Sequence, residues 1–533
     1  MIDAGGAKRM LRIWALVAGT FFGVGAQPAS ATIAYRISLA NPDQHLFHVE
    51  MTIPVNGKEV VTALPAWNAL YQVRDFSYRV TAVSALCAAS TGVTLAARLL
   101  DKDTWRISLA GMCQPGDRNS FEIRYSIRWD DSGPFNSQLN DHHAFMNLAE
   151  ILMYVPDRRA EDTSVTFENL PAGWRTAAEL ATGGVPNTYA AASYDSLVDA
   201  PVEAGEFDEF QFVESGARFR VVVDATNWKK EALEGALERI TRYEMRLMGG
   251  PPPFDLPSRG YTFVVHIGPY EDQGGGGMEH RNSTAIAATS VEAAAAVAAH
   301  EFFHVWNVKR IRPRTLEPVD YTKEQYTRAL WFAEGVTSCY ASFVLERSGL
   351  WSKKQFYDDL ALQISELQSR PAHTWQSAEA SSLDAWLEKY EAYNAPDRSI
   401  SYYDKGQILG VLLDLAIRDA TDNRKSLNDV LRRMNEEYAK KGKFYDDSNG
   451  IRATVEEVAG KNFEDFFASY VSGTAEIPYN DFLAVAGLEL NGSAAQAADR
   501  NVRSSEPSSI SEIAHPTDRQ RRIREGLLRG TTD

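Results

Sequence analysis

Cysteine is scarce in this chain, since its 533 residues include only Cys87, Cys113 and Cys339. A fold stapled by disulfides would need many more, so the hydrophobic core must hold this one together. Cys87 and Cys113 both lie in the strand-rich N-terminal half and could pair in an oxidising compartment. Cys339 is left over, and we expect it to pack inside a helix as a small apolar residue.

Basic residues are outnumbered: 55 Lys and Arg stand against 71 Asp and Glu, which gives a net charge of -16. Binding to phosphates needs concentrated Lys and Arg, so the composition argues against a nucleic-acid partner. The hydrophobic fraction of 44% and the charged fraction of 24% are typical of a globular protein. A chain of 533 residues is too long for one hydrophobic core, and we expect two or three domains.

Long apolar runs are missing from the sequence after residue 31. Before that point, the basic residues Lys8, Arg9 and Arg12 precede an apolar run over residues 13–26, and Ala29-Ser30-Ala31 fits the small-x-small rule for cleavage. The run is short for an uncleaved anchor, which needs about 20 residues. We therefore predict a signal peptide over residues 1–31, a periplasmic or secreted protein, and no stable membrane insertion after cleavage.

Apolar and polar residues alternate through much of the region 32–225. The stretch "FEIRYSIRW", residues 121–129, places apolar side chains on one face and charged or polar ones on the other. This is the period of a half-buried strand, and Gly, Pro, Asn and Asp turns separate several such stretches. The pattern predicts an N-terminal antiparallel β-domain over residues 32–225.

The period becomes helical after residue 225. "KKEALEGALERITRYEMRLMGG" ends at Gly249-Gly250 and three prolines, a strong stop signal. One strand, "RGYTFVVHIG", and several helical stretches follow, which predicts a mostly helical domain over residues 226–490. Residues 491–533 are polar and Ser/Ala-rich, and we expect a flexible tail in which "DRQRRIREGLLRG" can form one short amphipathic helix with solvated arginines. The predicted fold class is α+β, with several domains.

The stretch "AAHEFFHVWNVKRIRP" carries two histidines four residues apart. On a helix, His300 and His304 project from the same face one turn apart, a spacing that suits two ligands of one tetrahedral zinc ion. Glu301 follows about 100° further round the helix, where it can reach a metal-bound water without ligating the metal. The motif alone is only suggestive, because a zinc hydrolase needs a third ligand.

"WFAEGVTSCY" offers that ligand in Glu334, which stands among apolar and small residues. A carboxylate there is costly to bury without a partner, and a metal ion supplies one. The alternative is a Glu334 that faces solvent or pairs with an arginine. Two neutral imidazoles and one carboxylate leave a zinc site net positive, so the site lowers the pKa of bound water towards about 7 and Glu301 can take the proton.

Two further stretches could complete a peptidase site. In "GGGGMEHRNST", four glycines allow close backbone approach to a substrate and Glu279 places a carboxylate at the edge of the cleft, unless the stretch is an ordinary flexible loop with a surface acid. In "SYYDKGQILG", Tyr402 and Tyr403 precede a helix. A tyrosine hydroxyl aimed at the metal can donate a hydrogen bond to a developing oxyanion, although an ordinary core or surface tyrosine fits the same letters.

These stretches, in this order, resemble the glycyl aminopeptidase family of gluzincin zinc metallopeptidases. They resemble more distantly the large zinc aminopeptidases that carry a G-x-M-E-N signature. The resemblance is good over residues 226–490 and loose over the β-domain. It implies a thermolysin-like catalytic domain beside the β-domain, one zinc ion per chain, and removal of N-terminal Gly or Ala from peptides.

The resemblance also implies residue roles. His300, His304 and Glu334 bind zinc, Glu301 is the general base and acid, and Tyr403 stabilises the tetrahedral intermediate. Glu279 anchors the free α-amino group of the peptide substrate. From the glycine-rich stretch itself, we also assign Gly276, Gly277 and Met278 to the substrate-binding site.

One feature departs from the resemblance. Many family members continue into a C-terminal PDZ domain, whereas 43 residues follow Leu490 here (533 minus 490), fewer than the roughly 50 of even a small domain. Two other functions remain open at this stage: a zinc endopeptidase in which Glu279 is structural, and a non-catalytic peptide-binding protein with a structural metal site. The presence of the base Glu301 argues against the last, because a binding module has no need of it.

Overall fold

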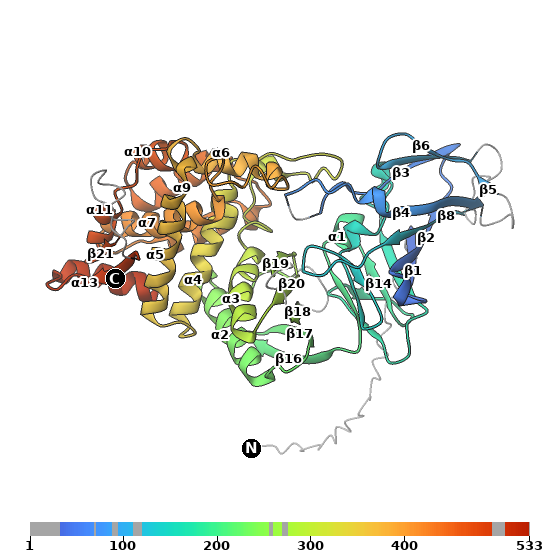
Figure 1. The fold of residues 1–533 in the computed structure, drawn as a ribbon, viewed down its shortest axis with the longest axis horizontal. Coiled ribbons are helices and arrows are strands. Elements are labelled where there is room, and N and C mark those ends of the chain that lie inside the picture. Colours follow the sequence, from blue (N-terminus) through green and yellow to red (C-terminus); the bar gives the residue numbers. More distant parts are fainter. Residues whose placement is uncertain are drawn as a thin grey trace, which may run out of the picture.

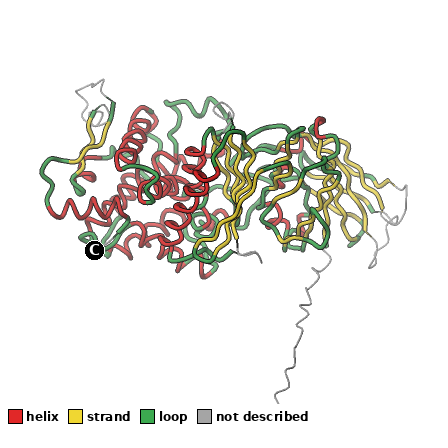
Figure 2. The backbone as a smooth tube through the Cα atoms, turned by 90° about the horizontal axis from the view of Figure 1, so that it is seen from below, coloured by secondary structure: helices red, strands yellow, loops and turns green. Residues whose placement is uncertain are grey.

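A computed structural model describes residues 32–68, 71–87, 94–109, 120–254, 260–268, 275–492 and 507–531. Strands fill the N-terminal half of the molecule and helices fill the C-terminal half (Figures 1 and 2). The predicted signal peptide, residues 1–31, and Cys113 lie outside the described residues. Within them, no helix is long and apolar enough to cross a membrane.

The main sheet of the N-terminal domain has the strand order β13-β14-β11-β1-β2-β8-β4-β5. Its neighbours are antiparallel except for β1 and β11, which run parallel. The alternating burial along β8 confirms the half-buried strand expected there. The strands are β1 (Ile33–Ser38), β2 (Leu46–Pro54), β4 (Val80–Cys87), β5 (Thr94–Leu95), β8 (Ser120–Arg128), β11 (Thr163–Glu168), β13 (Ala181–Thr182) and β14 (Thr188–Ala191).

Two smaller sheets complete this domain, with the orders β12-β15-β10-β9 and β3-β7-β6. Their strands are β3 (Glu59–Ala63), β6 (Ala97–Leu99), β7 (Thr104–Ser108), β9 (Gln138–Leu139), β10 (His143–Met146), β12 (Arg175–Ala177) and β15 (Val202–Gly205). The short helix α1 (Tyr194–Val198) precedes β15 and begins at Ser193, whose hydroxyl accepts the N–H of Ser196.

The sheet of the second domain has the order β16-β17-β18-β20-β19. Its strands are β16 (Asp208–Glu214), β17 (Ala217–Ala225), β18 (Gly260–Ile267), β19 (Gly276–Glu279) and β20 (Ser283–Ala288). The predicted boundary after residue 225 is therefore wrong. Strand β17 pairs in parallel with β18, and β16 pairs with β17, so both strands belong to the second domain. Alternation identifies a strand but not its partner, so only the sheet pairing assigns these two strands to the second domain.

Helices cover this sheet and form most of the rest of the second domain (Figure 1). The helix α2 ends at Gly249, whose φ of 87° is a left-handed cap, as the double glycine predicted. The longer helices are α2 (Lys230–Met248), α3 (Val291–Glu301), α4 (Thr337–Arg347), α5 (Lys353–Ser369), α7 (Tyr402–Ala420), α8 (Leu427–Glu437), α9 (Asp447–Ala459) and α13 (Asp518–Arg529). Shorter ones are α6 (Ala378–Leu383), α10 (Glu464–Phe466) and α11 (Tyr479–Ala484).

The two domains interlock through aromatic residues. Trp67, from the N-terminal domain, packs in the core of the helical domain, with its ring 5.2 Å from that of Trp386, and donates a hydrogen bond to the carbonyl of Asp320 at 2.6 Å. Tyr321, from the helical domain, lies in the core of the N-terminal domain, with its ring 5.9 Å from that of Tyr194. Each domain thus completes the core of the other, which fixes their relative position.

Residues 507–531 form regular structure, unlike the flexible tail expected over 491–533. Strand β22 (Ser509–Glu512) pairs with β21 (Leu488–Asn491), and α13 buries Ile523 and Leu527. Arg347 on α4 donates to the carbonyl of Leu527 at 2.6 Å. The predicted amphipathic helix is confirmed, but the two apolar residues one turn apart dock it on the helical domain instead of leaving it in solvent.

The cysteines follow the sequence prediction in part. Cys339 is a buried free thiol on α4. Cys87, at the end of β4, is disulfide-bonded.

Candidate active site

Three predicted metal ligands meet where α3 ends. His300 Nε2 lies 3.0 Å from His304 Nε2 and 3.4 Å from Glu334 Oε2, and His304 Nε2 lies 3.2 Å from the same carboxylate oxygen. Ligand atoms about 2.0 Å from a tetrahedral zinc ion are about 3.3 Å from one another. The three residues therefore fit one zinc ion, with a fourth position left open.

Contrary to the sequence prediction, the two histidines do not share one α-helix, because α3 ends between them. Ser290 caps α3 by accepting the N–H of Ala293, and the α-helix ends at Glu301. The next turn, Phe303–Val305, is a 3₁₀-helix, so His304 belongs to a tighter turn than His300. Their rings still face the same space, with centroids 4.6 Å apart.

Two residues that the sequence reading missed hold the imidazoles in place. The Ser338 hydroxyl lies 3.2 Å from His300 Nδ1, and the carbonyl of Asn307 accepts from His304 Nδ1 at 2.6 Å. Both contacts leave Nε2 of each ring free for a metal, as is usual for metal-binding histidines. Ser338 follows Glu334 by four residues in "WFAEGVTSCY". On a helix this spacing places Ser338 on the same face as Glu334, and the sequence could have indicated its role in this way.

Glu334 lies on a π-helical turn, Trp331–Val336, that leads into α4. Its side chain is buried, which by itself would raise the pKa of the carboxyl, but the neighbouring His304 and His300 hold that pKa well below its ordinary value. The carboxylate is therefore ionised inside the protein. The alternative of a solvent-facing Glu334 is excluded, and its charge is balanced at the histidines.

Glu301 points into the same space without taking part in the ligand triangle. It is buried, and its Oε2 has no hydrogen-bond partner among the described residues. Burial raises the pKa of Glu301 well above its usual value, and the carboxylates of Glu279 and Glu334 add to this. A buried, unpartnered carboxyl oxygen beside a metal triangle is suited to exchange a proton with a water molecule.

Gly277 makes room for Glu301. A β-carbon built on Gly277 would lie 2.4 Å from the Glu301 Cγ and 2.5 Å from its Oε1, which is closer than real contacts allow. Any side chain at position 277 would thus displace the carboxylate. The sequence reading took this glycine as a close approach to substrate, whereas the structure shows a close approach to Glu301.

Glu279 ends β19, the edge strand next to β20. Its carboxylate comes within 4.8 Å of a ring nitrogen of His304 and of a carboxylate oxygen of Glu301. The preceding Met278 is buried, and Gly276 has a φ of 140°, which favours glycine. The stretch predicted as a glycine loop is thus partly a strand, and it brings Glu279 to the candidate metal site.

Tyr403 approaches from α7, at the first turn of that helix. Its ring centroid lies 6.2 Å from that of His300. Burial, together with the charge of Glu334, raises the pKa of Tyr403 well above its ordinary value, so the phenol keeps its proton at neutral pH. The neighbouring Tyr402 stacks on it at 4.7 Å and is buried in the core. Of the two tyrosines, Tyr403 is the one at the site.

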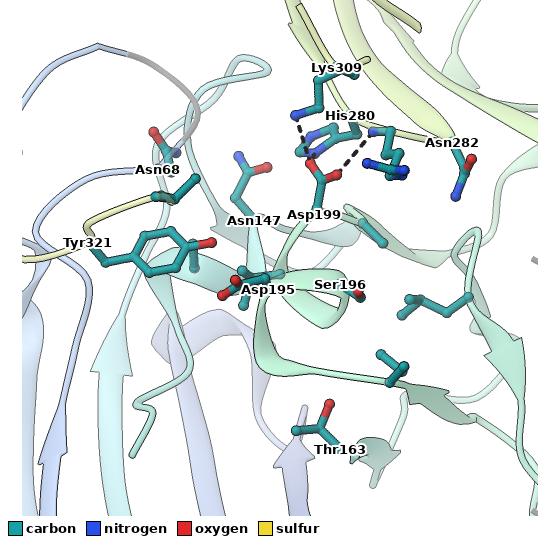
Figure 3. Close-up of a pocket in the computed structure, with 18 of the residues that line it drawn as sticks. Asn68, Asn147, Thr163, Asp195, Ser196, Asp199, His280, Asn282, Lys309 and Tyr321 are labelled. Carbon is teal, nitrogen blue, oxygen red and sulfur yellow. Dashed lines mark hydrogen bonds and ion pairs between the residues drawn. The ribbon is translucent and has the colours of Figure 1, made fainter. Parts of the chain in front are cut away.

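A cavity of about 770 Å³ opens beside Glu279, between the two domains (Figure 3). Helix α1 of the N-terminal domain forms one wall, and residues that follow β19 form another. Buried polar atoms without a partner among the described residues, Asn147 Oδ1, His280 Nε2 and Asn282 Oδ1, belong to residues that line it. The cavity is therefore suited to polar ligands or water.

A second group of the same residue types lies at the domain interface. His143 Nδ1 and His266 Nε2 each lie 2.9 Å from Glu203, on different carboxylate oxygens. These are hydrogen-bond distances on two separate oxygens, in contrast to the shared triangle formed with Glu334. The group joins β10 and β15 of the first domain to β18 of the second as a buried, charged clamp.

Two family models match this chain. The M61 glycyl aminopeptidase family model matches residues 293–409, and the M61 peptidase N-terminal domain model matches residues 34–206. The two matches together span more than half of the chain, and the second ends just before β16. Among curated proteins, none matches this sequence.

Solved structures share the fold. An aminopeptidase N family protein from Idiomarina loihiensis is 25% identical, with a TM-score of 0.78 over 86% of this chain and 79% of that one. The M1 zinc metallopeptidase from Deinococcus radiodurans, at 16% identity, has a TM-score of 0.50 over 84% of this chain and 94% of its own. With both family models, the chain belongs to the M61 glycyl aminopeptidase family and is a peptidase of the aminopeptidase type.

Proposed function

We propose that this protein is an exported zinc aminopeptidase that removes Gly or Ala from the free N-terminus of peptides, with Glu301 as its general base. The observation that carries the proposal is the position of Glu279, within 4.8 Å of Glu301 and His304. A carboxylate there can pair with the α-ammonium group of a peptide. The first peptide bond then lies at Glu301, which favours exopeptidase action over internal cleavage.

His300, His304 and Glu334 would hold the zinc ion. When bound, zinc supplies Lewis acidity that polarises the peptide carbonyl and makes water more acidic. Glu301 would accept a proton from the attacking water and pass it to the departing amine. The protonated phenol of Tyr403 would donate a hydrogen bond to the oxygen that gains negative charge in the transition state.

The preference for small N-terminal residues rests on the family, whose model is described as that of a glycyl aminopeptidase. Export rests on the N-terminal sequence pattern, and the disulfide-bonded Cys87 fits an oxidising compartment. Fractionation of the host cells and sequencing of the mature N-terminus would test export. A start at Thr32 is expected, and an intact Met1 in the cytoplasm would contradict it.

The decisive experiment is cleavage of a matched peptide panel, followed by mass spectrometry. Gly-, Ala-, Leu- and Arg-initiated peptides are each supplied with a free and an N-acetylated terminus, and Glu301→Gln serves as the control. Stepwise loss of Gly or Ala from free peptides alone is the expected result. Internal cuts in acetylated peptides would identify an endopeptidase instead, and no cleavage by zinc-loaded protein would favour a peptide-binding role.

Glu279→Gln tests the amine anchor in the same panel. The variant keeps the size of the side chain and loses its charge, so it should lose most of the preference for free over acetylated termini. An unchanged preference would remove Glu279 from this role and leave it a structural residue.

A further inference from the structure

The carboxylate of Asp199, in the N-terminal domain, accepts hydrogen bonds from three groups of the catalytic domain. Asp199, directly after α1, accepts hydrogen bonds from His280 Nδ1 at 3.2 Å, from the N–H of Arg281 at 3.1 Å and from Lys309 Nζ at 3.0 Å (Figure 3). The three donors come from two different segments of the catalytic domain. Asp199 therefore ties both segments to the wall of the cavity that α1 forms.

Each of the two segments continues directly into the active site. His280 and Arg281 follow Glu279, so their bonds to Asp199 hold the end of β19. The N–H of Lys309 donates to the carbonyl of His304 at 3.1 Å, so this lysine is joined to the turn that carries a metal ligand. Asp199 thus contacts both the residues that follow Glu279, the candidate amine anchor, and a residue bonded to the turn that carries His304.

The strand β19 needs such support because it is the edge of its sheet. In the described part of the chain it pairs with β20 alone. At its other end the N-terminal domain is also close, since a β-carbon built on Gly276 would lie 3.5 Å from the Phe135 ring. The N-terminal domain therefore contacts both ends of β19. Phe135 lies near its first residue, and Asp199 makes the polar contacts just after its last.

We propose that Asp199 is a positioning residue through which the N-terminal domain sets the place of Glu279, and thereby the affinity of the site for the substrate amine. This inference rests on the proposed role of Glu279 as the amine anchor. Loss of the Asp199 charge weakens the bond to Lys309 and the two bonds to the strand end, from His280 and Arg281. A shift of about 1 Å in a binding carboxylate is enough to weaken its contacts greatly.

The experiment compares Asp199→Asn with Asp195→Asn in the full-length, zinc-loaded protein. Asp195 is the matched control because it also lines the cavity, on α1, but pairs with Arg159 of its own domain at 2.6 Å. The substrate is a free Gly-initiated peptide. A second measurement compares inhibition by glycinamide with inhibition by acetamide, which lacks the amine.

Asp199→Asn should raise KM for the free peptide roughly tenfold, the equivalent of one weakened charge-assisted hydrogen bond, with a kcat changed less than about threefold. It should weaken inhibition by glycinamide and leave that by acetamide unchanged. Zinc content and the unfolding temperature should match those of Asp195→Asn. A purely structural role would lower the active fraction, and hence kcat, without this selective loss.

Equal effects on both inhibitors, a change in kcat alone, or no change in KM would each overturn the role of Asp199. If Asp199→Asn fails to fold, Lys309→Met supplies the second variant, and it should produce the same selective loss of glycinamide binding. Wild-type protein that does not distinguish glycinamide from acetamide would overturn the amine-anchor function itself, and this inference with it. The wild-type measurement therefore distinguishes failure of the amine-anchor function from failure of the role of Asp199 alone.

Discussion

The backbones of Gly335 and Gly406 touch. A β-carbon on Gly335 would lie 2.5 Å from the Gly406 Cα, and one on Gly406 would lie 2.1 Å from the carbonyl oxygen of Trp331. This contact packs α7 directly on the π-helical turn that carries Glu334. The candidate metal ligand Glu334 and Tyr403, three residues before Gly406, are thereby held on two adjoining backbones.

Gly406→Ala should therefore destabilise the protein by about 1–3 kcal/mol, because the methyl group overpacks a contact between two backbones. The same displacement should move Glu334 and lower zinc affinity. Denaturant unfolding and a competition assay with a zinc chelator measure the two effects. Gly235→Ala is the control, since its β-carbon would meet no atom within 4 Å. Equal stability of the two variants would refute the contact.

Gly277→Ala should lower kcat by roughly 10²-fold or more, because the methyl group would displace the Glu301 carboxylate, and a positioned acid–base group contributes about 10²–10⁴-fold. Zinc content should stay at the wild-type level, since Glu301 is not in the ligand triangle. Steady-state kinetics and metal analysis check both points. Wild-type kcat in a folded Gly277→Ala protein would show that Glu301 does not act from its observed position.

Ser338→Ala should weaken zinc binding by about 10–100-fold, the usual cost of removing a group that orients a metal-binding histidine. The hydroxyl meets His300 Nδ1 at 3.2 Å, and its loss leaves the ring free to turn. Zinc-buffered titrations of the protein measure the affinity. Ser338→Thr, which keeps the hydroxyl, should retain most of it, and equal losses in the two variants would point to packing instead.

The buried carboxyl group of Glu244 should make the protein less stable as the pH rises. This residue of α2 is buried, neither carboxyl oxygen has a partner among the described residues, and burial raises its pKa well above 4.5. Between pH 4.5 and the raised pKa, the folded state binds the proton that the unfolded state has lost, so stability falls as the pH rises through that window.

Glu244→Met should remove this pH dependence and raise the free energy of unfolding at pH 8 by about 1–3 kcal/mol, the cost of an unpaired buried polar group. Urea unfolding of both proteins between pH 5 and 8 checks the slope. A wild-type stability that rises with pH over this range, or a Glu244→Met protein that is less stable at pH 8, would contradict the prediction.

The buried group of His143, Glu203 and His266, which joins the two domains, should stabilise the protein most at an intermediate pH. The carboxylates of Glu203 and Asp224 raise the pKa of His143 above 6.5 although burial lowers it, and both histidines lower the pKa of Glu203 below 4.5 although burial raises it. The stabilisation from His143 is complete below pH 6.5 and is lost as the pH rises through its raised pKa. The stabilisation from Glu203 is complete above pH 4.5 and is lost as the pH falls through its lowered pKa.

Glu203→Gln should remove both limbs of that dependence and lower stability by about 3–5 kcal/mol near pH 6, because the buried histidines lose their charged partner. Thermal unfolding between pH 3 and 9 measures the profile. Glu209→Gln, which alters a partly exposed carboxylate paired with Arg220, is the control and should change stability much less. A profile unchanged by Glu203→Gln would show that the clamp does not control stability.

The sequence by itself determined which residues are candidates for the chemistry of this protein. The H-E-x-x-H spacing and a carboxylate among apolar residues at Glu334 indicate a candidate zinc-ligand set, and periods of two and 3.6 residues separate strands from helices. Each of these signals is read from residues close together in the chain, so local order carries it. Glu279 and Tyr403 needed the family resemblance as well, because a single carboxylate or tyrosine has no distinctive spacing.

Only the tertiary structure decided which distant segments meet. It placed β16 and β17 in the catalytic sheet, docked α13 on α4, set Gly277 against Glu301, and joined Asp199 to Lys309 across 110 positions of the chain. Such contacts depend on the packing and pairing free energy of the whole fold, in which many strand partners satisfy the same alternating pattern. A local period cannot distinguish among those partners, whereas the assembled core admits one of them.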